Sequence, residues 1–161
     1  MLQKIKNRGL TLIGVILLFL SCSTKSEEKQ VENTLELINS FSINISEPSG
    51  LAINNEGTEL YTVSDNTNKI YKLSTTGKVL KTYNYEGNDL EGVSMFTSNK
   101  LLLAEERTKE IVVFDLQNNT FNKHKVAYEN KDANSGIEGV AFNPNNNTIF
   151  ILNEKNPGFL I

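Results

Sequence analysis

A short phrase built around glycine recurs along this chain and constrains its fold more than any other feature. It is Asp-Leu-Glu-Gly-Val from Asp89 and Gly-Ile-Glu-Gly-Val from Gly136, with a weaker form, Pro-Ser-Gly-Leu, from Pro48. The glycine before the final apolar residue recurs after 42 and then 47 positions. After each copy come an alternating run, a polar turn and a second apolar run that ends at an acid. A period of roughly 40 to 50 residues with several strands per unit indicates a β-propeller blade.

Apolar alternation and turn residues divide the repeats, at about 46–88, 89–135 and 136–161, into strands. The predicted strands are residues 51–54, 59–64, 69–73 and 79–85, then 93–96, 100–105, 110–115 and 121–128, then 140–143, 148–153 and a start at 159–161. An alternating segment at 35–43 predicts one more strand before the first repeat. Gly57 and Gly77 lie in turns that need positive φ. No stretch after the first 22 residues has a helical period, so we predict an all-β protein.

Three repeats do not close a ring, because propellers usually have about four to eight blades. We therefore predict a β-propeller with four-stranded blades, here an incomplete ring of about two and a half blades over residues 34–161. The chain would then be a fragment of roughly half a propeller. If it does stop at Ile161, the open edge at residues 159–161 is expected to pair with another chain or to aggregate.

Charge and composition exclude several classes of protein. The net charge is −3, which gives no basic field for the phosphates of nucleic acid. One cysteine and one histidine rule out a disulfide framework and a Cys/His zinc cluster. A hydrophobic fraction of 39% is enough for a packed core.

The first 21 residues resemble a bacterial lipoprotein signal that ends in a lipobox. They combine a basic start, an apolar run over residues 10–20 and Phe19-Leu20-Ser21 before Cys22. That run is short for a mature transmembrane helix, which needs about 20 apolar residues. In such signals the cysteine is lipidated and begins the mature protein, although Leu is usual where Phe19 stands. The alternative is an uncleaved anchor, and both hypotheses place the rest of the chain outside the cytoplasm.

Residues 22–33 are polar and charged without apolar periodicity, which predicts a flexible tether between membrane and propeller. The acidic pair Glu27-Glu28 resembles the export signal of surface lipoproteins in some Gram-negative bacteria, and a solvated linker explains it equally well. The expected location is the cell envelope, lipid-anchored at Cys22 and facing the periplasm or the cell surface.

Several short segments are typical of one family of bacterial proteins: residues 47–52, 61–66, 89–93, 102–107, 136–141 and 153–155. On these segments the chain, from residue 41 onward, resembles the SdiA-regulated family of bacterial extracytoplasmic proteins. The resemblance implies a six-bladed propeller related in architecture to NHL, SMP-30-like and esterase-like phytase propellers. It implies no settled reaction, and the later blades of the family pattern are not in this sequence.

A calcium site is the first hypothesis for the glutamates of the repeated phrase. The first strand of a propeller blade lines the central channel, so Glu91 and Glu138 should lie at its mouth, with Ser49 in the equivalent place of the first repeat. Ca²⁺ takes six to eight oxygen ligands, and crowded carboxylates either bind a cation or raise one another's pKa. The alternative is structural: both glutamates accept backbone N–H groups of the next blade. Repetition favours this alternative, because repeats reuse structural solutions.

Asp65, Glu106 and Glu154 end the second strand of each repeat and are weaker candidates for the same cation. Capping of the following turn is the more economical explanation of these three acids. The oxygen-rich run from Asp65 to Asn68 lacks the glycine and terminal glutamate of an EF-hand loop.

No catalytic residue is predicted. His124 lies between two lysines on an outer strand, where we expect it to face solvent, and no G-x-S-x-G motif occurs. The first functional hypothesis is therefore a cell-envelope lipoprotein whose propeller binds an unknown small molecule or protein. The alternative is a metal-dependent hydrolase of phosphate or other esters, with a channel Ca²⁺ as Lewis acid.

Overall fold

The computed structural model describes residues 35–128, 136–154 and 158–161. The chain divides into two compact units, residues 1–37 and 38–161, and all the strands lie in the second. The lipoprotein signal, Cys22 and the tether lie outside the described residues. Within the described residues, no helix is both long and apolar enough to cross a membrane.

The strands form three antiparallel sheets, each built from consecutive strands, and each sheet is one blade. The first blade has β1 (Pro48–Ile53), β2 (Glu59–Ser64), β3 (Lys69–Ser74) and β4 (Val79–Thr82). The second has β5 (Leu90–Thr97), β6 (Lys100–Glu105), β7 (Glu110–Asp115) and β8 (Thr120–Lys125). The third has β9 (Ile137–Asn143), β10 (Thr148–Asn153) and β11 (Phe159–Leu160). This is the predicted all-β architecture of four-stranded blades in an incomplete ring.

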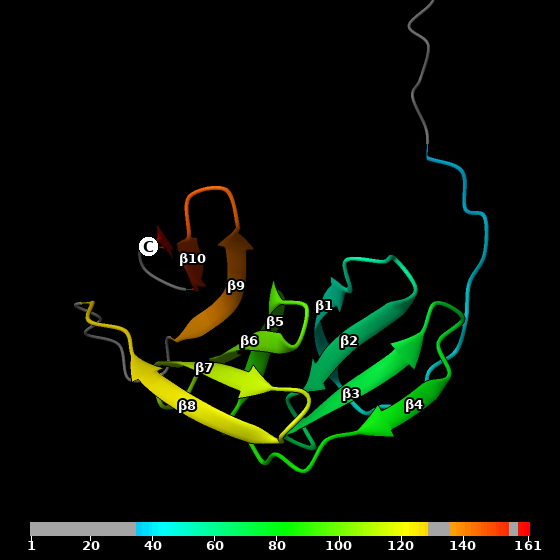
Figure 1. The fold of residues 1–161 in the computed structure, drawn as a ribbon, viewed down its shortest axis with the longest axis horizontal. Helices are drawn as coiled ribbons and strands as arrows, with labels where there is room; N and C mark the ends of the chain where they lie inside the picture. The colour runs from blue at the N-terminus through cyan, green and yellow to red at the C-terminus, as the bar shows by residue number, and fades with distance from the viewer. Residues whose placement is uncertain (1–34, 129–135, 155–157) are drawn as a thin grey trace, which may run out of the picture. The chain divides into compact units, whose positions relative to one another are not determined.

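The first strands of the blades lie next to one another, β1 beside β5 and β5 beside β9 (Figure 1). Glycine permits this close approach. A Cβ on Gly50, which has φ +64°, would lie 2.9 Å from the backbone nitrogen of Val93. A Cβ on Gly92 would lie 3.1 Å from the Cα of Gly139. The neighbouring blade therefore leaves little space for a side chain at Gly50 and Gly92.

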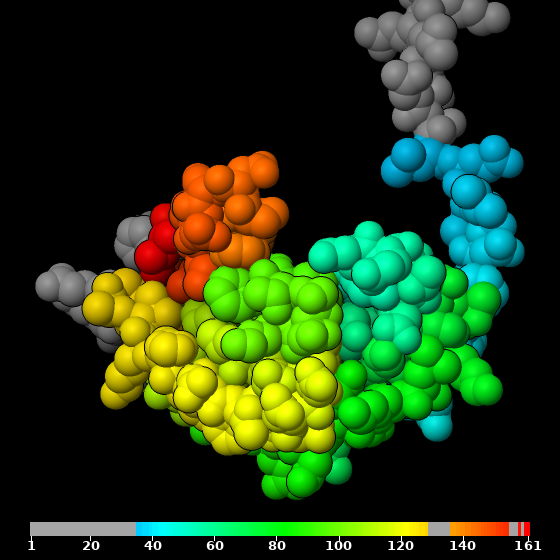
Figure 2. Space-filling model, in the orientation of Figure 1, coloured from blue at the N-terminus to red at the C-terminus, as the bar shows by residue number. Residues whose placement is uncertain are grey.

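The hydrophobic core lies between the blades. Alternate residues of each strand face opposite neighbours, so a blade in the middle has two buried faces. Leu101 and Leu103 of β6 pack in the cluster shared with the first blade, and Leu102 packs in the cluster shared with the third. In Figure 2 the first blade (teal to green) and the second blade (lime to yellow) are in contact along their length, as expected of two blades that share a hydrophobic core.

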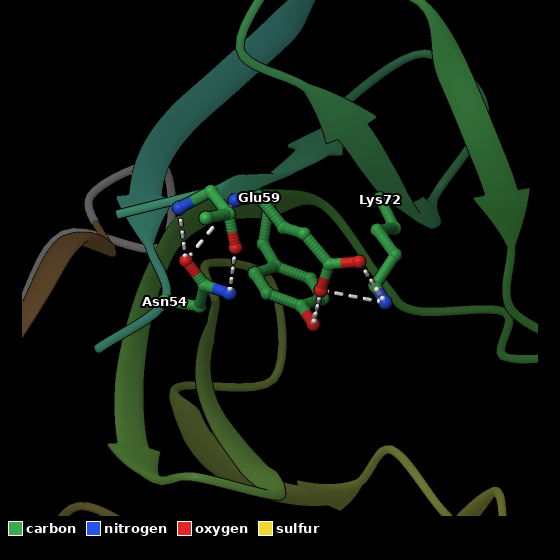
Figure 3. A network of polar contacts seen from close by, with 5 residues as sticks. Asn54, Glu59 and Lys72 are labelled. Atoms are coloured by element: carbon green, nitrogen blue, oxygen red, sulfur yellow. Dashed lines mark hydrogen bonds and ion pairs between the residues drawn. The ribbon is translucent and has the colours of Figure 1, made fainter. Parts of the chain in front are cut away.

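Local polar contacts fix the hairpins of the first blade (Figure 3). The side-chain oxygen of Asn54 accepts the N–H groups of Thr58, at 2.8 Å, and Glu59, at 3.0 Å, across the turn from β1 to β2. The Glu59 carboxylate then pairs with Lys72 on β3 at 2.7 Å. Gly57 and Gly77 have φ of +70° and +80°, as the turn pattern predicts.

Two tyrosines from the end of one blade bond to polar groups buried in the next. The Tyr85 hydroxyl donates to the Glu105 carboxylate at 2.6 Å, and the Tyr128 hydroxyl donates to the Asn153 side chain at 2.8 Å. Glu105 also pairs with Lys123 of β8 at 2.7 Å. Because Glu105 and Asn153 end the second strands of their blades, the same link is used twice between blades.

The predicted strand at residues 35–43 is wrong. This segment forms no strand and pairs with no sheet, and its apolar side chains are largely exposed. Its period-two alternation matches a strand, but strand structure also needs a neighbour for the backbone N–H and C=O groups. The fourth strands are shorter than predicted, because β4 ends at Thr82 and β8 at Lys125. The predicted strand start at residues 159–161 is confirmed as β11, which pairs with β10.

Candidate functional site

The acids after the second strands are held by one repeated backbone bond. Each N–H donates to the carbonyl of the residue three positions before the repeated glycine of the same blade. The three bonds are Asp65 to Glu47 (3.2 Å), Glu106 to Asp89 (2.8 Å) and Glu154 to Gly136 (3.2 Å). Each bond brings the end of a second strand to the start of the first strand, so the acids gather at one end of the blades.

The first acid cluster contains Asp65, Asp89 and Glu91. One carboxylate oxygen of each lies within 4.8 Å of the others, and all three residues are half-buried. Asp65 comes from the first blade, whereas Asp89 and Glu91 come from the second. Arg107 supplies a positive charge, donating to Oδ2 of Asp89 from Nη2 at 2.8 Å and from Nε at 3.2 Å.

The two aspartates of this cluster share a proton at mildly acid pH. The hydrogen bond to Asp89 raises the pKa of Asp65 to about 6, and burial and nearby negative charge add to the rise. The same bond, together with Arg107, lowers the pKa of Asp89. Burial is the main cause of a raised pKa at Glu91, opposed by a hydrogen bond from Ser49.

The second acid cluster contains Glu106, Glu138 and Glu154, again with oxygens within 4.8 Å of one another. Glu106 comes from the second blade, and the other two come from the third. Burial and the charge of Glu106 raise the pKa of Glu138 to about 7. A Cβ on Gly136 would collide with the side chain of Glu106, so glycine at this position leaves room for that carboxylate.

The two clusters are electrostatically continuous. Glu106 and Glu154 of the second cluster raise the pKa of Glu91 in the first, and Glu91 raises that of Glu138. Six carboxylates from three blades therefore share one region, in which Arg107 pairs with Asp89. Such a region favours bound cations or protons.

All five acids that the sequence analysis selected lie in these clusters, but they are divided between the two clusters. Glu91 joins Asp65, and Glu138 joins Glu106 and Glu154. A hydrogen bond from the Ser49 side chain opposes the rise in the pKa of Glu91, and a hydrogen bond with the Glu154 side chain adds to the rise in the pKa of Glu138.

The residues before two of these acids contact the turns that follow. The Ser64 hydroxyl oxygen accepts the N–H of Thr67 at 2.9 Å, and the Glu105 carboxylate accepts the Thr108 hydroxyl at 2.9 Å. His124 is exposed on β8, as predicted.

Sequence reasoning missed Asp89, Arg107 and Asn68 as site residues. Asn68 has φ +53°, and its side-chain oxygen accepts the N–H of Asp89 at 2.6 Å. Asp89 opens the repeated phrase, but glycine stands at the equivalent position 136, so repetition did not single it out. The Asp-x-Glu spacing at residues 89–91 was the available signal, because alternate residues of a strand share a face.

Comparison with known proteins gives the family and the fold. A family model described as SdiA-regulated matches residues 25–161. A luciferin-regenerating enzyme aligns over 71% of this chain and 39% of its own, with 16% identity and a TM-score of 0.55. The hydrazine synthase of Kuenenia stuttgartiensis aligns over 73% and 32%, with 14% identity and a TM-score of 0.54. A streptogramin B lyase aligns over 65% and 33%, with 20% identity and a TM-score of 0.51.

The structural neighbours are β-propellers, and at these identities the likeness concerns the fold alone. This chain spans between 32% and 39% of the length of the three solved chains. The predicted propeller architecture and the predicted family are both confirmed.

Proposed function

This chain belongs to the SdiA-regulated family, and we propose that it is a cell-envelope lipoprotein whose β-propeller binds a ligand or partner through its acid clusters. One observation carries the proposal: six carboxylates from three blades converge in one region, in two groups of three whose oxygens lie within 4.8 Å of one another. A molecule that presents positive charge would relieve this repulsion.

Calcium is the cation that we propose for the second acid cluster. Glu106 and Glu154 follow the ends of β6 and β10, and Glu138 lies in β9, so the three carboxylates come from three strands. Ca²⁺ accepts monodentate or bidentate carboxylates in a flexible geometry. The raised pKa of Glu138 supports this choice, because a group that resists ionisation on its own gains most from a neighbouring cation. Glu106, Glu138 and Glu154 would be the protein ligands, with water completing the shell.

A calcium titration monitored by thermal unfolding at pH 7.5 tests the proposal. At a concentration one hundred times the dissociation constant, binding stabilises the native state by about 2.7 kcal/mol, or roughly 5–10 °C in Tm. The double variant Glu106→Gln/Glu138→Gln should lose the response. Glu56→Gln, which removes the same type of charge from an exposed turn, should keep it. An unchanged Tm in the wild-type protein would refute calcium binding.

A metal-dependent hydrolase is the second candidate, and the pKa of Glu138 is the observation that favours it. A carboxyl with a pKa of about 7 is suited to general acid or base catalysis at neutral pH. A panel of phosphate and carboxylic esters, measured with Ca²⁺ and with chelator, separates the candidates. Metal-dependent turnover that Glu138→Gln abolishes would favour the hydrolase. Calcium stabilisation without turnover would favour the binding module.

The membrane anchor is a separate part of the proposal and rests on the sequence that ends at Cys22. Lipidation at sulfur predicts that the protein fractionates with membranes and incorporates labelled palmitate in bacterial cells. Cys22→Ser should abolish the label and release the protein from the membrane if the signal is a lipoprotein signal. Retention of the variant in the membrane would favour the uncleaved anchor.

A further inference from the structure

A pocket of about 420 Å³ lies between the first and second blades, at the end opposite the acid clusters. It is lined by β2, β3 and β4 of the first blade and by the β5–β6 and β7–β8 turns of the second. Glu59 begins β2 and Asp65 follows its end, so about 20 Å of strand separates the pocket from the first acid cluster. The volume lies within the range of about 300–1,000 Å³ for small-molecule pockets, and both blades that line it have four strands.

The strand register turns one row of first-blade side chains toward this pocket. Tyr61, Lys72 and Lys81 are direct cross-strand neighbours on β2, β3 and β4, so they share one face of the blade. Glu59 is two residues before Tyr61 and shares that face as well. Tyr61 packs in the core cluster shared with the second blade. This face therefore points at the second blade, and its row of polar groups lines one wall of the pocket.

Glu59 and Lys72 present a carboxylate and an ammonium side by side. Lys72 Nζ donates to the Glu59 carboxylate at 2.7 Å, and the Tyr61 hydroxyl donates to Oε2 of Glu59 at 3.5 Å (Figure 3). The Glu59 and Lys72 side chains are 32% and 23% exposed. A hydrogen-bond acceptor and a hydrogen-bond donor are thus fixed next to each other and stay accessible in the wall of the pocket.

Lys81 adds an ammonium that is held against an aromatic ring. Its Nζ lies 4.2 Å from the centroid of the Tyr83 ring, and the Tyr83 side chain is buried. Lys81 is exposed and forms no salt bridge with any described residue, so its N–H groups remain available to a ligand. From the second blade, Asn99 and Gln117 present exposed side-chain amides, each of which both donates and accepts.

Charge decides between the classes of small molecule that this pocket would take. The lining side chains carry two carboxylates, Glu56 and Glu59, and two ammonium groups, Lys72 and Lys81, so their charges cancel. A pocket without net charge favours no ion of either sign. A zwitterion would gain little from Glu59 and Lys72, which already neutralise each other. A neutral molecule with several hydroxyl groups fits this set of side chains, because each hydroxyl both donates and accepts.

We propose that this pocket binds a neutral saccharide. Adjacent hydroxyl groups of the sugar donate to the Glu59 carboxylate and accept from Lys72, and further hydroxyls bond to Lys81 and to the amides of Asn99 and Gln117. This site is separate from the proposed cation site and requires no metal, because different side chains form it at the other end of the blades.

The test is a titration of the protein in EDTA with cellobiose, maltose and N,N′-diacetylchitobiose, monitored by the amide NMR shifts of Asn99 and Leu116. Saturable shifts at these amides are expected with at least one of the three disaccharides. Lys81→Met should weaken its binding about tenfold, because a hydrogen bond from a charged donor is lost. Gln117→Ala, on the other blade, should weaken it less. Both side chains are exposed, so both variants should keep the wild-type melting temperature.

Lys78→Met is the matched control, since it makes the same change at an exposed lysine outside the pocket, and it should bind the disaccharide as the wild type does. No saturable shift with any of the three disaccharides would overturn the proposal, and so would binding that Lys81→Met leaves unchanged. Tighter binding of glucuronate or of dialanine would overturn it in favour of an anion or a zwitterion. Because EDTA removes free Ca²⁺, the calcium proposal stands or falls separately from these outcomes.

Discussion

Glu105 and Glu106 are adjacent residues with opposite electrostatic settings. Glu105 is fully buried inside the second blade, and its two oxygens are bonded to Tyr85, Thr108 and Lys123 at 2.6 to 2.9 Å. Glu106, the next residue, is half-buried and lies among Glu138 and Glu154. The chain provides a cation for the first carboxylate and further carboxylates for the second.

This difference separates a structural role from a binding role. A buried carboxylate without a partner would cost several kcal/mol, so the Lys123 pair and the tyrosine link are needed to stabilise the native state. The second acid cluster holds three carboxylates within 4.8 Å of one another, and a proton or a bound cation would reduce their repulsion. Three predictions change one side of this comparison at a time.

Lys123→Met should have the largest effect, a loss of about 3 kcal/mol in the free energy of unfolding, because it leaves the Glu105 charge buried without its cation. Chemical denaturation at pH 7 measures the loss. Lys125→Met, on the same strand at an exposed position, is the matched control and should change stability by less than about 0.5 kcal/mol. The double variant Lys123→Met/Glu105→Leu should recover most of the loss. Failure to recover would show that Glu105 has a role beyond its pairing.

Glu138→Gln should have a smaller effect of the opposite sign. The native state raises the pKa of Glu138 from 4.5 to about 7, so the wild-type protein loses stability as pH rises through this window. Below pH 4.5 both states carry the protonated acid, and the variant should match the wild type. Above pH 7 the variant should be more stable by about 1 kcal/mol, a value reduced for solvent screening of a half-exposed group. Thermal unfolding from pH 4 to 8 in chelator checks this, and a variant less stable at pH 8 would contradict it.

Arg107→Gln should have the smallest effect, confined to the first acid cluster. Asp65 and then Arg107 lower the pKa of Asp89, so the native state gains stability above pH 3.8. Removing the guanidinium should reduce this gain slightly at pH 7, and the difference should disappear as the acid is protonated. Because Arg107 is exposed, the same change at pH 7 in 1 M salt should be smaller still. An effect equal to that of Lys123→Met would mean that Arg107 has contacts beyond Asp89.

The fold was predictable because the same order of strands and turns recurs in three repeats. β2, β6, β7 and β10 have the predicted bounds, since each combines clear alternation with a turn on both sides. The segment at residues 35–43 has the same alternation and is no strand. A sequence pattern records which side chains prefer burial, and does not record whether a strand lies alongside to complete the ladder.

The site was predictable in its residue types and not in its grouping. All five selected acids lie in the clusters, because equivalent positions of a repeat recur at equivalent places in space. Which acid meets which depends on the stacking of one blade on the next, and this placed Glu91 with Asp65 rather than with Glu138. The burial of Glu105 and its ion pair with Lys123 were not predicted. They depend on where β8 lies relative to the end of β6, and the sequence pattern does not show this position.

The pKa of Glu138, measured by NMR titration of its side-chain carboxyl carbon with and without Ca²⁺, shows whether carboxylates of neighbouring blades crowd and bind a cation at the second acid cluster. We expect a value of about 7 in chelator and a marked decrease when Ca²⁺ is added. A value near 4.5 in chelator would contradict the crowding of carboxylates across blades. A value of about 7 that Ca²⁺ leaves unchanged would contradict cation binding at the second acid cluster.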